Sequence, residues 1–246
     1  ELTHPPTGLL AVAAALRTGL VAAVDGLPDP GAGLVPGLAV GDTSAVSEDL
    51  DQQMKASSLS HLTAVSGANC ALVVGIAFGI AALCGARRGI RVTAGLATLV
   101  AFIVLVSPEP SVVRAGAMAA IAMLGVLLGR IGAGMSILSA SVCVLLLLDP
   151  WLAASLGFAL SAVATGSLLL FAGPLADGMS RWMPAPLALA LSVPLAAQLA
   201  CGPLLILIEP TVPLVGVLAN LLAGPAAPAA TVLGLLACLA LPFPVL

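Results

Sequence analysis

The feature that most restricts the fold of this chain is a series of long apolar segments, which begins after His61 and continues almost to the C-terminal end. An α-helix needs about 20 apolar residues to cross the hydrocarbon core of a bilayer. Most of these segments approach that length, so we predict one membrane-spanning helix in each. The predicted spans are Ser66–Cys84, Ile90–Val106, Ser111–Leu128, Gly134–Leu148, Trp151–Phe171 and Pro186–Ile208.

Composition decides between the two kinds of structure that can cross a membrane. Only 8% of the residues are charged and 61% are hydrophobic, too little charge to cover the surface of a water-soluble domain. In lipid the backbone must satisfy its own hydrogen bonds, as helices or as a closed barrel. A barrel would need alternating strands and aromatic girdles, but the chain has no Tyr, five Phe and two Trp. The sequence therefore predicts an all-α, polytopic helical bundle with broken helices.

The first 60 residues differ from the rest, and we assign residues 1–60 to an N-terminal interfacial or amphipathic segment of the same module. Gly8–Val24 either spans the membrane or lies in its interface, because it is short and carries Arg17 at its centre. Thr43–Ser60 holds four charged residues and predicts a short, hydrated, amphipathic helix. Residues 61–246 form the membrane domain. Because the chain opens at Glu1, we expect it to be part of a longer protein.

The C-terminal tail, Val212–Leu246, is apolar but interrupted by prolines such as Pro225 and Pro228. Proline removes a backbone donor and breaks or kinks a helix. The tail therefore predicts either one long crossing or two short half-helices.

Basic residues occur in every second loop between the predicted spans. The first, third and fifth loops carry Arg87, Arg130 and Arg181, whereas the second, fourth and sixth carry no Lys or Arg. Because cytoplasmic loops are enriched in Lys and Arg, we predict that these three loops face the cytoplasm and that His61 lies on the outer side.

No group of residues in the sequence indicates catalysis, a metal or a cofactor. The five cysteines stand far apart in apolar segments, where Cys acts as a small hydrophobic residue. His61 and Ser66 are too isolated to form a hydrolytic site without a second base. A phosphate-binding loop with its Lys is also missing. We therefore predict that the chain is not an enzyme.

A few polar residues lie at or near membrane depth, where such groups are costly and usually face a cavity or another helix. Each also has a purely structural explanation: Arg114 can extend to the outer headgroups, His61 and Asn69 can cap a helix, and Gln198 can bond a neighbouring helix. The candidates are His61, Ser66, Asn69, Arg114, Gln198 and Asn220. Asn220 and Gln198 lie near Pro and Gly residues, which indicate broken helices beside protein or a water-filled space.

These residues lie in short motifs that resemble those of the ComEC competence-protein family, in the same order along about residues 35–235. The motifs are Gly41-Asp42, Ser60–Asn69, Pro110–Ala115, Asp149–Trp151, Gly157–Ser161, Ala197–Leu199, Pro203-Leu204 and Ala219–Leu222 with Pro225. Many family members carry His at the position of Asn69. Both side chains can donate a hydrogen bond.

The resemblance implies a channel in the bacterial cytoplasmic membrane that carries single-stranded DNA into the cell during natural transformation. It also implies an outer DNA receptor and a cytoplasmic motor or DNA-binding protein as partners, alongside membrane lipid. Any nuclease activity would belong to a separate domain. We predict a path with His61, Ser66, Asn69 and Arg114 at its outer mouth and with Gln198 and Asn220 deeper. The alternatives are a small-solute transporter, although the chain lacks the internal repeats typical of that class, and a membrane-embedded hydrolase.

Overall fold

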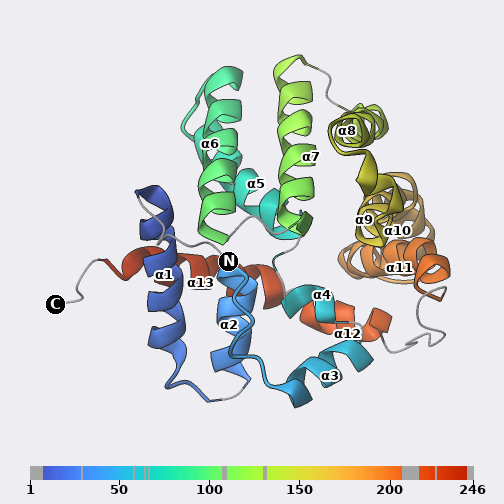
Figure 1. Cartoon of the computed structure of the whole chain (residues 1–246). Coiled ribbons are helices and arrows are strands. Elements are labelled where there is room, and N and C mark those ends of the chain that lie inside the picture. Colours follow the sequence, from blue (N-terminus) through green and yellow to red (C-terminus); the bar gives the residue numbers. More distant parts are fainter. Residues whose placement is uncertain are drawn as a thin grey trace. The chain divides into compact units, whose positions relative to one another are not determined.

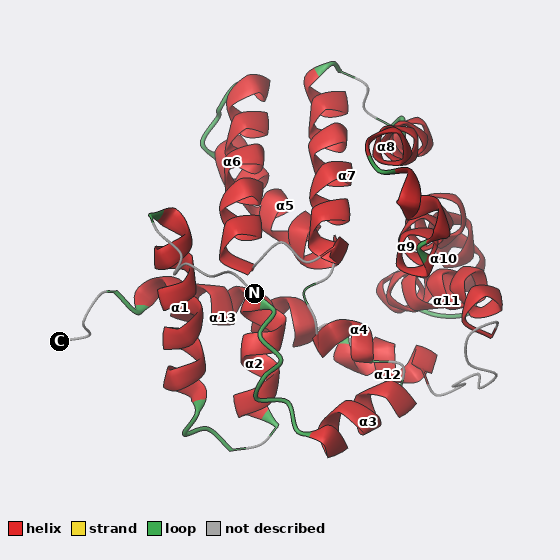
Figure 2. Cartoon of the chain, in the orientation of Figure 1, coloured by secondary structure: helices red, strands yellow, loops and turns green. Residues whose placement is uncertain are grey.

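The computed structural model describes nine stretches of the chain: residues 8–28, 30–57, 59–63, 65, 67–106, 110–129, 132–206, 216–224 and 226–242. The regular structure in these stretches is helical, and none of them contains a β-strand (Figure 2). The predicted all-α fold is therefore confirmed.

The chain divides into two compact units. The first comprises Glu1–Gly116 together with Gly224–Leu246, and the second comprises Ala117–Ala223. Each unit is described by itself below. This division does not test the assignment of residues 1–60 and 61–246 to separate segments, which stays a prediction.

The first unit brings the two ends of the chain together. Helices α1 (Leu9–Val24) and α2 (Gly31–Val40) pack against each other and against α13 (Ala226–Ala240) near the C-terminus (Figure 1). Side chains from all three helices and from α6 (Arg88–Val106) form one buried apolar cluster. Its members include Leu20, Val40, Leu105 and Cys238. Gly8–Val24 is therefore part of a packed core.

Helix α2 was not predicted, because its sequence contains three glycines and a proline, which usually indicate a loop. The glycines allow close approach. A Cβ atom on Gly33 would lie 2.7 Å from the backbone oxygen of Ala45. A Cβ atom on Gly234 of α13 would lie 2.6 Å from the Cβ atom of Ala39. Tertiary packing thus stabilises a helix that local propensity disfavours.

The predicted hydrated helix in 43–60 is confirmed as α3 (Glu48–Ala56), which buries none of its residues. The Ser47 hydroxyl caps it by accepting a hydrogen bond from the Leu50 N–H at 3.3 Å. Lys55 and Asp51 form an ion pair one turn apart. The short α4 (Ser60–Thr63) follows and contacts α2 and α3. Next, α5 (Gly67–Leu83) packs along α6 (Figure 1).

The second unit contains most of α7 (Pro110–Leu127), which begins in the first unit. The following elements are α8 (Gly134–Leu148), η1 (Pro150–Ala154), α9 (Leu156–Ser167), η2 (Leu168–Ala172), α10 (Gly173–Met179), α11 (Ala185–Ile206) and α12 (Gly216–Ala223). Helix α11 packs against α9, η2, α10 and α12. The segment η2 is a π-helical turn that joins α9 and α10 into one rod.

Four helices in the described residues are long and apolar enough to cross a membrane: Arg88–Val106, Pro110–Leu127, Leu156–Met179 and Ala185–Ile206. Helices α5, with 17 residues, and α8, with 15, are apolar but shorter. Each of the six predicted spans overlaps a helix. Four of these helices are long enough to cross a membrane, and α5 and α8 are shorter than a full crossing.

The bounds of the predicted span Trp151–Phe171 were wrong at both ends. Trp151 lies in the separate 3-10 turn η1, which Asp149 caps by accepting a hydrogen bond from the Trp151 N–H at 3.1 Å. The Ser155 hydroxyl then caps a new helix at the Phe158 N–H. That helix continues past Phe171 as far as Met179. In the tail the described residues form two short helices, α12 and α13, which is the second of the two predicted forms.

Candidate functional site

The C-terminal end of α2 meets the beginnings of α5 and α7 and the end of α6 in the first unit. Gly41 ends α2 with a φ of 75°, and a Cβ atom there would lie 3.2 Å from Val106 and 3.3 Å from Val65. A Cβ atom on Gly67 would lie 3.2 Å from the Cβ atom of Ala115 in α7. Glycine at both positions lets the four segments approach closely. We call this region the α2 junction.

A backbone carbonyl at the α2 junction accepts hydrogen bonds from two distant side chains. Asn69 Nδ2 donates to the Leu38 oxygen at 3.2 Å, and Thr231 Oγ1 donates to the same oxygen at 3.3 Å. The donors lie 31 and 193 positions away in the sequence. The Leu38 carbonyl thus ties α5 and α13 to the end of α2.

The geometry of the helix end explains why this carbonyl is available. The last carbonyls of an α-helix have no partner within the helix. The Gly41 N–H bonds the Gly37 oxygen at 3.1 Å, and the Asp42 N–H reaches back to the Pro36 oxygen at 3.3 Å. The bond from Gly41 to Gly37 is that of an αL helix ending, and neither bond uses the Leu38 oxygen, which is left to side chains from elsewhere. Asn69 therefore satisfies a backbone carbonyl of another helix.

Arg114 lies in the second turn of α7, next to Ala115 at the α2 junction. Its side chain is half-buried. Its Nε atom is buried, and among the described residues it is the one buried side-chain nitrogen or oxygen without a hydrogen-bond partner. A buried donor without an acceptor costs about 1–3 kcal/mol, and more when the group is charged.

Two of the predicted path residues lie in the second unit. Gln198 is half-buried in α11, between Pro194 and Pro203, the two prolines of that helix. Asn220 lies in α12, and its Nδ2 donates to the Gly216 oxygen of the same helix at 2.8 Å. Helices α11 and α12 contact each other, so these residues lie on neighbouring elements.

The remaining predicted residues are placed only in part. His61 lies in α4, and Ser66 lies outside the described residues. Arg130 of the predicted cytoplasmic loops also lies outside them, whereas Arg87 and Arg181 are exposed in the turns that precede α6 and α11. The structure thus joins Asn69 to the end of α2 in one unit and places Gln198 and Asn220 on two contacting helices in the other.

Sequence reasoning missed Thr231 and the Leu38 carbonyl. Thr231 is fully buried, but its sequence neighbours are ordinary small and apolar residues. A backbone acceptor has no signal in the sequence at all. The Gly41-Asp42 pair was the available indication, because glycine followed by a polar residue is typical of a helix end.

The architecture and the surface together define the class of protein. Four helices can cross a membrane by length and composition, and large apolar side chains are widely exposed. Leu83 is 91% exposed, Leu147 82% and Leu222 80%. Apolar exposure on this scale is compatible with lipid as the surrounding solvent rather than water. The chain is an all-α membrane protein.

Comparison with known proteins identifies the family. The family model described as Competence protein matches residues 38–246, and the chain belongs to this family. No curated protein and no solved structure matches the chain. The resemblance found in the sequence motifs is therefore confirmed, and membership connects the chain with DNA uptake in competence.

Proposed function

We propose that this chain forms the channel through which single-stranded DNA crosses the cytoplasmic membrane. The observation that carries the proposal is the buried Arg114 Nε without an acceptor, in a protein of the competence family. Guanidinium groups bind phosphate oxygens through paired N–H donors, so a phosphodiester that displaced the atoms covering Arg114 Nε would supply the missing acceptor.

The neutral polar residues suit a path that a polyanion must also leave. Conduction requires contacts that are weak and repeated. Asn69 uses one amide N–H on Leu38, which leaves its second N–H and its carbonyl oxygen for other partners. Arg114, His61 and Asn69 of the first unit would contribute the outer mouth, and Gln198 and Asn220 would be the path residues of the second unit.

In this proposal, partner proteins supply the driving force for DNA transport. The channel itself carries out no chemistry; an outer receptor delivers the strand, and a cytoplasmic motor or DNA-binding protein withdraws it. In the predicted orientation the Arg87, Arg130 and Arg181 loops lie in the cytoplasm. The outer mouth then faces the receptor, and the other end of the channel faces the motor or DNA-binding protein.

A substitution at Arg114 tests the proposal in the full-length protein. We expect Arg114→Ala to reduce the transfer of labelled DNA into the cytoplasm at least tenfold, because the mouth loses its one cation. Arg114→Lys should retain part of the activity, since it keeps the charge without the paired donors. Transfer would be measured as uptake of labelled DNA and as transformants per cell.

The matched control is Arg88→Ala, which removes an exposed arginine at the start of α6. Immunoblots and melting temperatures of the purified variants should show that all of them are made and folded. Undiminished DNA transfer by a folded Arg114→Ala protein would remove Arg114 from the path and contradict the proposal.

A further inference from the structure

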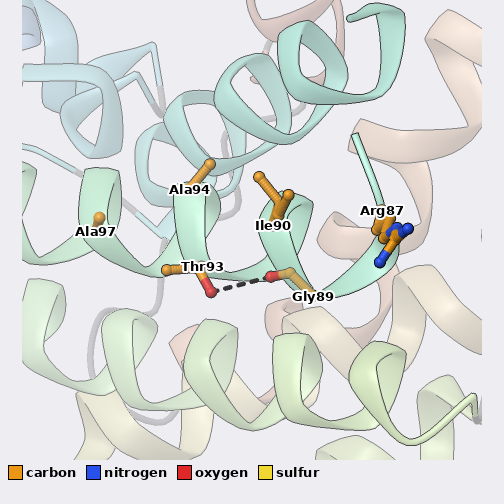
Figure 3. Close-up of a pocket in the computed structure, with 6 residues that line it drawn as sticks. All are labelled: Arg87, Gly89, Ile90, Thr93, Ala94 and Ala97. Carbon is orange, nitrogen blue, oxygen red and sulfur yellow. Dashed lines mark hydrogen bonds between the residues drawn. The ribbon is translucent and has the colours of Figure 1, made fainter. Parts of the chain in front are cut away.

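An open groove of about 750 Å³ runs along the N-terminal half of α6 (Figure 3). Its lining comes from α6 and the turn before it: Arg87, Gly89, Ile90, Thr93, Ala94 and Ala97. The groove is open rather than enclosed, so a ligand there would lie along the surface of the helix. It contains none of the residues of the proposed DNA path.

The groove lies on the face of α6 that the first unit leaves uncovered. The buried residues of this half of α6, Val92, Gly95 and Leu99, recur at helical spacing on one side. At 100° per residue, Ile90, Ala94 and Ala97 fall on the opposite side of the same helix. Ile90 is 59% exposed. Within the first unit, this face of a helix long and apolar enough to span a membrane is exposed.

The wall of the groove is apolar even where it carries a hydroxyl. Thr93 Oγ1 donates to the Gly89 oxygen at 2.9 Å, and Figure 3 shows this hydroxyl turned toward Gly89. A hydroxyl that bonds its own helix four residues back is not free for a polar ligand. The side chains of Ala94 and Ala97 are small and therefore leave space along the helix surface. An acyl chain fits such a surface.

The end of the groove is positively charged without an internal counter-ion. Arg87 lines the groove, and Arg88 and Arg91 follow within one turn, so three of the eight cations of the chain lie here. Residues 70–106 contain no Asp or Glu. In the described part of the chain, none of these three arginines forms an ion pair with a carboxylate. Arg91 Nε instead donates to the Ala86 oxygen at 2.7 Å.

We propose that this groove binds a phospholipid with an anionic headgroup, with the phosphate at Arg87 and one acyl chain along Ile90, Thr93 and Ala97. The predicted orientation places Arg87 at the cytoplasmic leaflet, where basic residues at the ends of membrane helices meet anionic headgroups. Arg87 would form an ion pair with the phosphate of the headgroup, and the apolar residues that follow it in α6 would contact the acyl chain. This lipid site is separate from the proposed DNA path. Its role would be to anchor the protein to anionic lipids of the membrane.

Native mass spectrometry of the full chain, purified in mild detergent, tests the proposal with phosphatidylglycerol and phosphatidylcholine as probes. The wild type should retain phosphatidylglycerol at least tenfold better than phosphatidylcholine. Arg87→Gln should abolish this preference, because it removes the charge that lines the groove. Ala97→Phe should lower the retention of both lipids, because it fills the path of the acyl chain.

Arg181→Gln is the matched control, since Arg181 is an exposed arginine of another predicted cytoplasmic loop and lies outside the groove. It should bind phosphatidylglycerol like the wild type. Equal retention of the two lipids by the wild type, or an unchanged preference in Arg87→Gln, would overturn the proposal. Inorganic phosphate should not displace the lipid at equal concentration; displacement would mean that Arg87 binds a phosphate without the acyl contact.

Discussion

Asn69 shows how a polar residue in an apolar helix can serve the fold and still be available to a ligand. Its Nδ2 holds the Leu38 carbonyl of α2 at 3.2 Å, together with Thr231 from α13. Such a shared acceptor has two lone pairs, so both donors can be satisfied at once. The fold occupies one donor of Asn69 and leaves its second N–H and its oxygen for other partners.

The Thr231 hydroxyl should contribute measurably to stability. Thr231→Val keeps the shape but removes the donor to Leu38, so we expect the protein to lose about 1 kcal/mol and to melt about 2–4 °C lower in detergent. Thr18→Val is the control, because the exposed Thr18 hydroxyl bonds carbonyls of its own helix. Equal melting temperatures for the two variants would mean that the Leu38 contact does not stabilise the junction.

At the scale of elements, the membrane helices followed directly from the sequence, whereas α2 did not. A long apolar run without breaks has few alternatives in lipid, so α6 and α7 were located within about two residues. Helix α11 runs unbroken from Ala185 to Ile206 although Pro194 and Pro203 lie inside it, where a broken helix was expected. Helix α2 is rich in glycine and proline and exists because α1, α13 and α6 surround it. The family match begins at residue 38, near the end of α2, although α1 and the rest of α2 belong to the same packed unit.

The contact between α2 and α13 should be the most sensitive helix–helix contact of the first unit. Gly234→Ala places a methyl group 2.6 Å from the Ala39 Cβ atom, which has no flexible end to move away. We expect a loss of about 1–3 kcal/mol as the helices separate. The measurement is thermal unfolding of the purified variant in detergent.

Gly75→Ala is the matched control for that experiment. Gly75 lies inside α5, and no atom lies within 4 Å of a Cβ atom built there. Because alanine is the better helix former, this variant should be as stable as the wild type or more stable by up to about 1 kcal/mol. A Gly234→Ala protein that melts like Gly75→Ala would show that α13 does not pack tightly on α2.

At the scale of the whole molecule, the orientation in the membrane follows from the predicted loops and is open to a chemical test. Cys84 is exposed in the turn between α5 and α6, near Arg87. In a variant that keeps Cys84 alone, a membrane-impermeant maleimide should label inside-out vesicles and leave intact cells unlabelled. Moving the single cysteine to the exposed position of Trp151 should give the opposite pattern.

The same labelling on both sides, or the reverse of the expected pattern, would contradict the alternation of basic and acidic loops on which the orientation depends. A reversed orientation would also place the Arg87 groove in the outer leaflet. The lipid-binding experiment in detergent does not depend on orientation, so the two results can be separated.

Composition was enough to identify lipid as the solvent of this protein and hence to predict its helical class, because so few charges cannot cover a surface in water and an unpaired backbone is too costly in lipid. The sequence also located most helices and, through ordered motifs, the family. The shared core of α1, α2 and α13, the bonds from Asn69 and Thr231 to Leu38, and the buried Arg114 Nε without a partner became visible in the fold alone. Cys238 bonds the Leu16 oxygen 222 positions away and Thr231 bonds the Leu38 oxygen 193 positions away, and both acceptors are backbone atoms, which every residue has and which no pattern of side chains reveals.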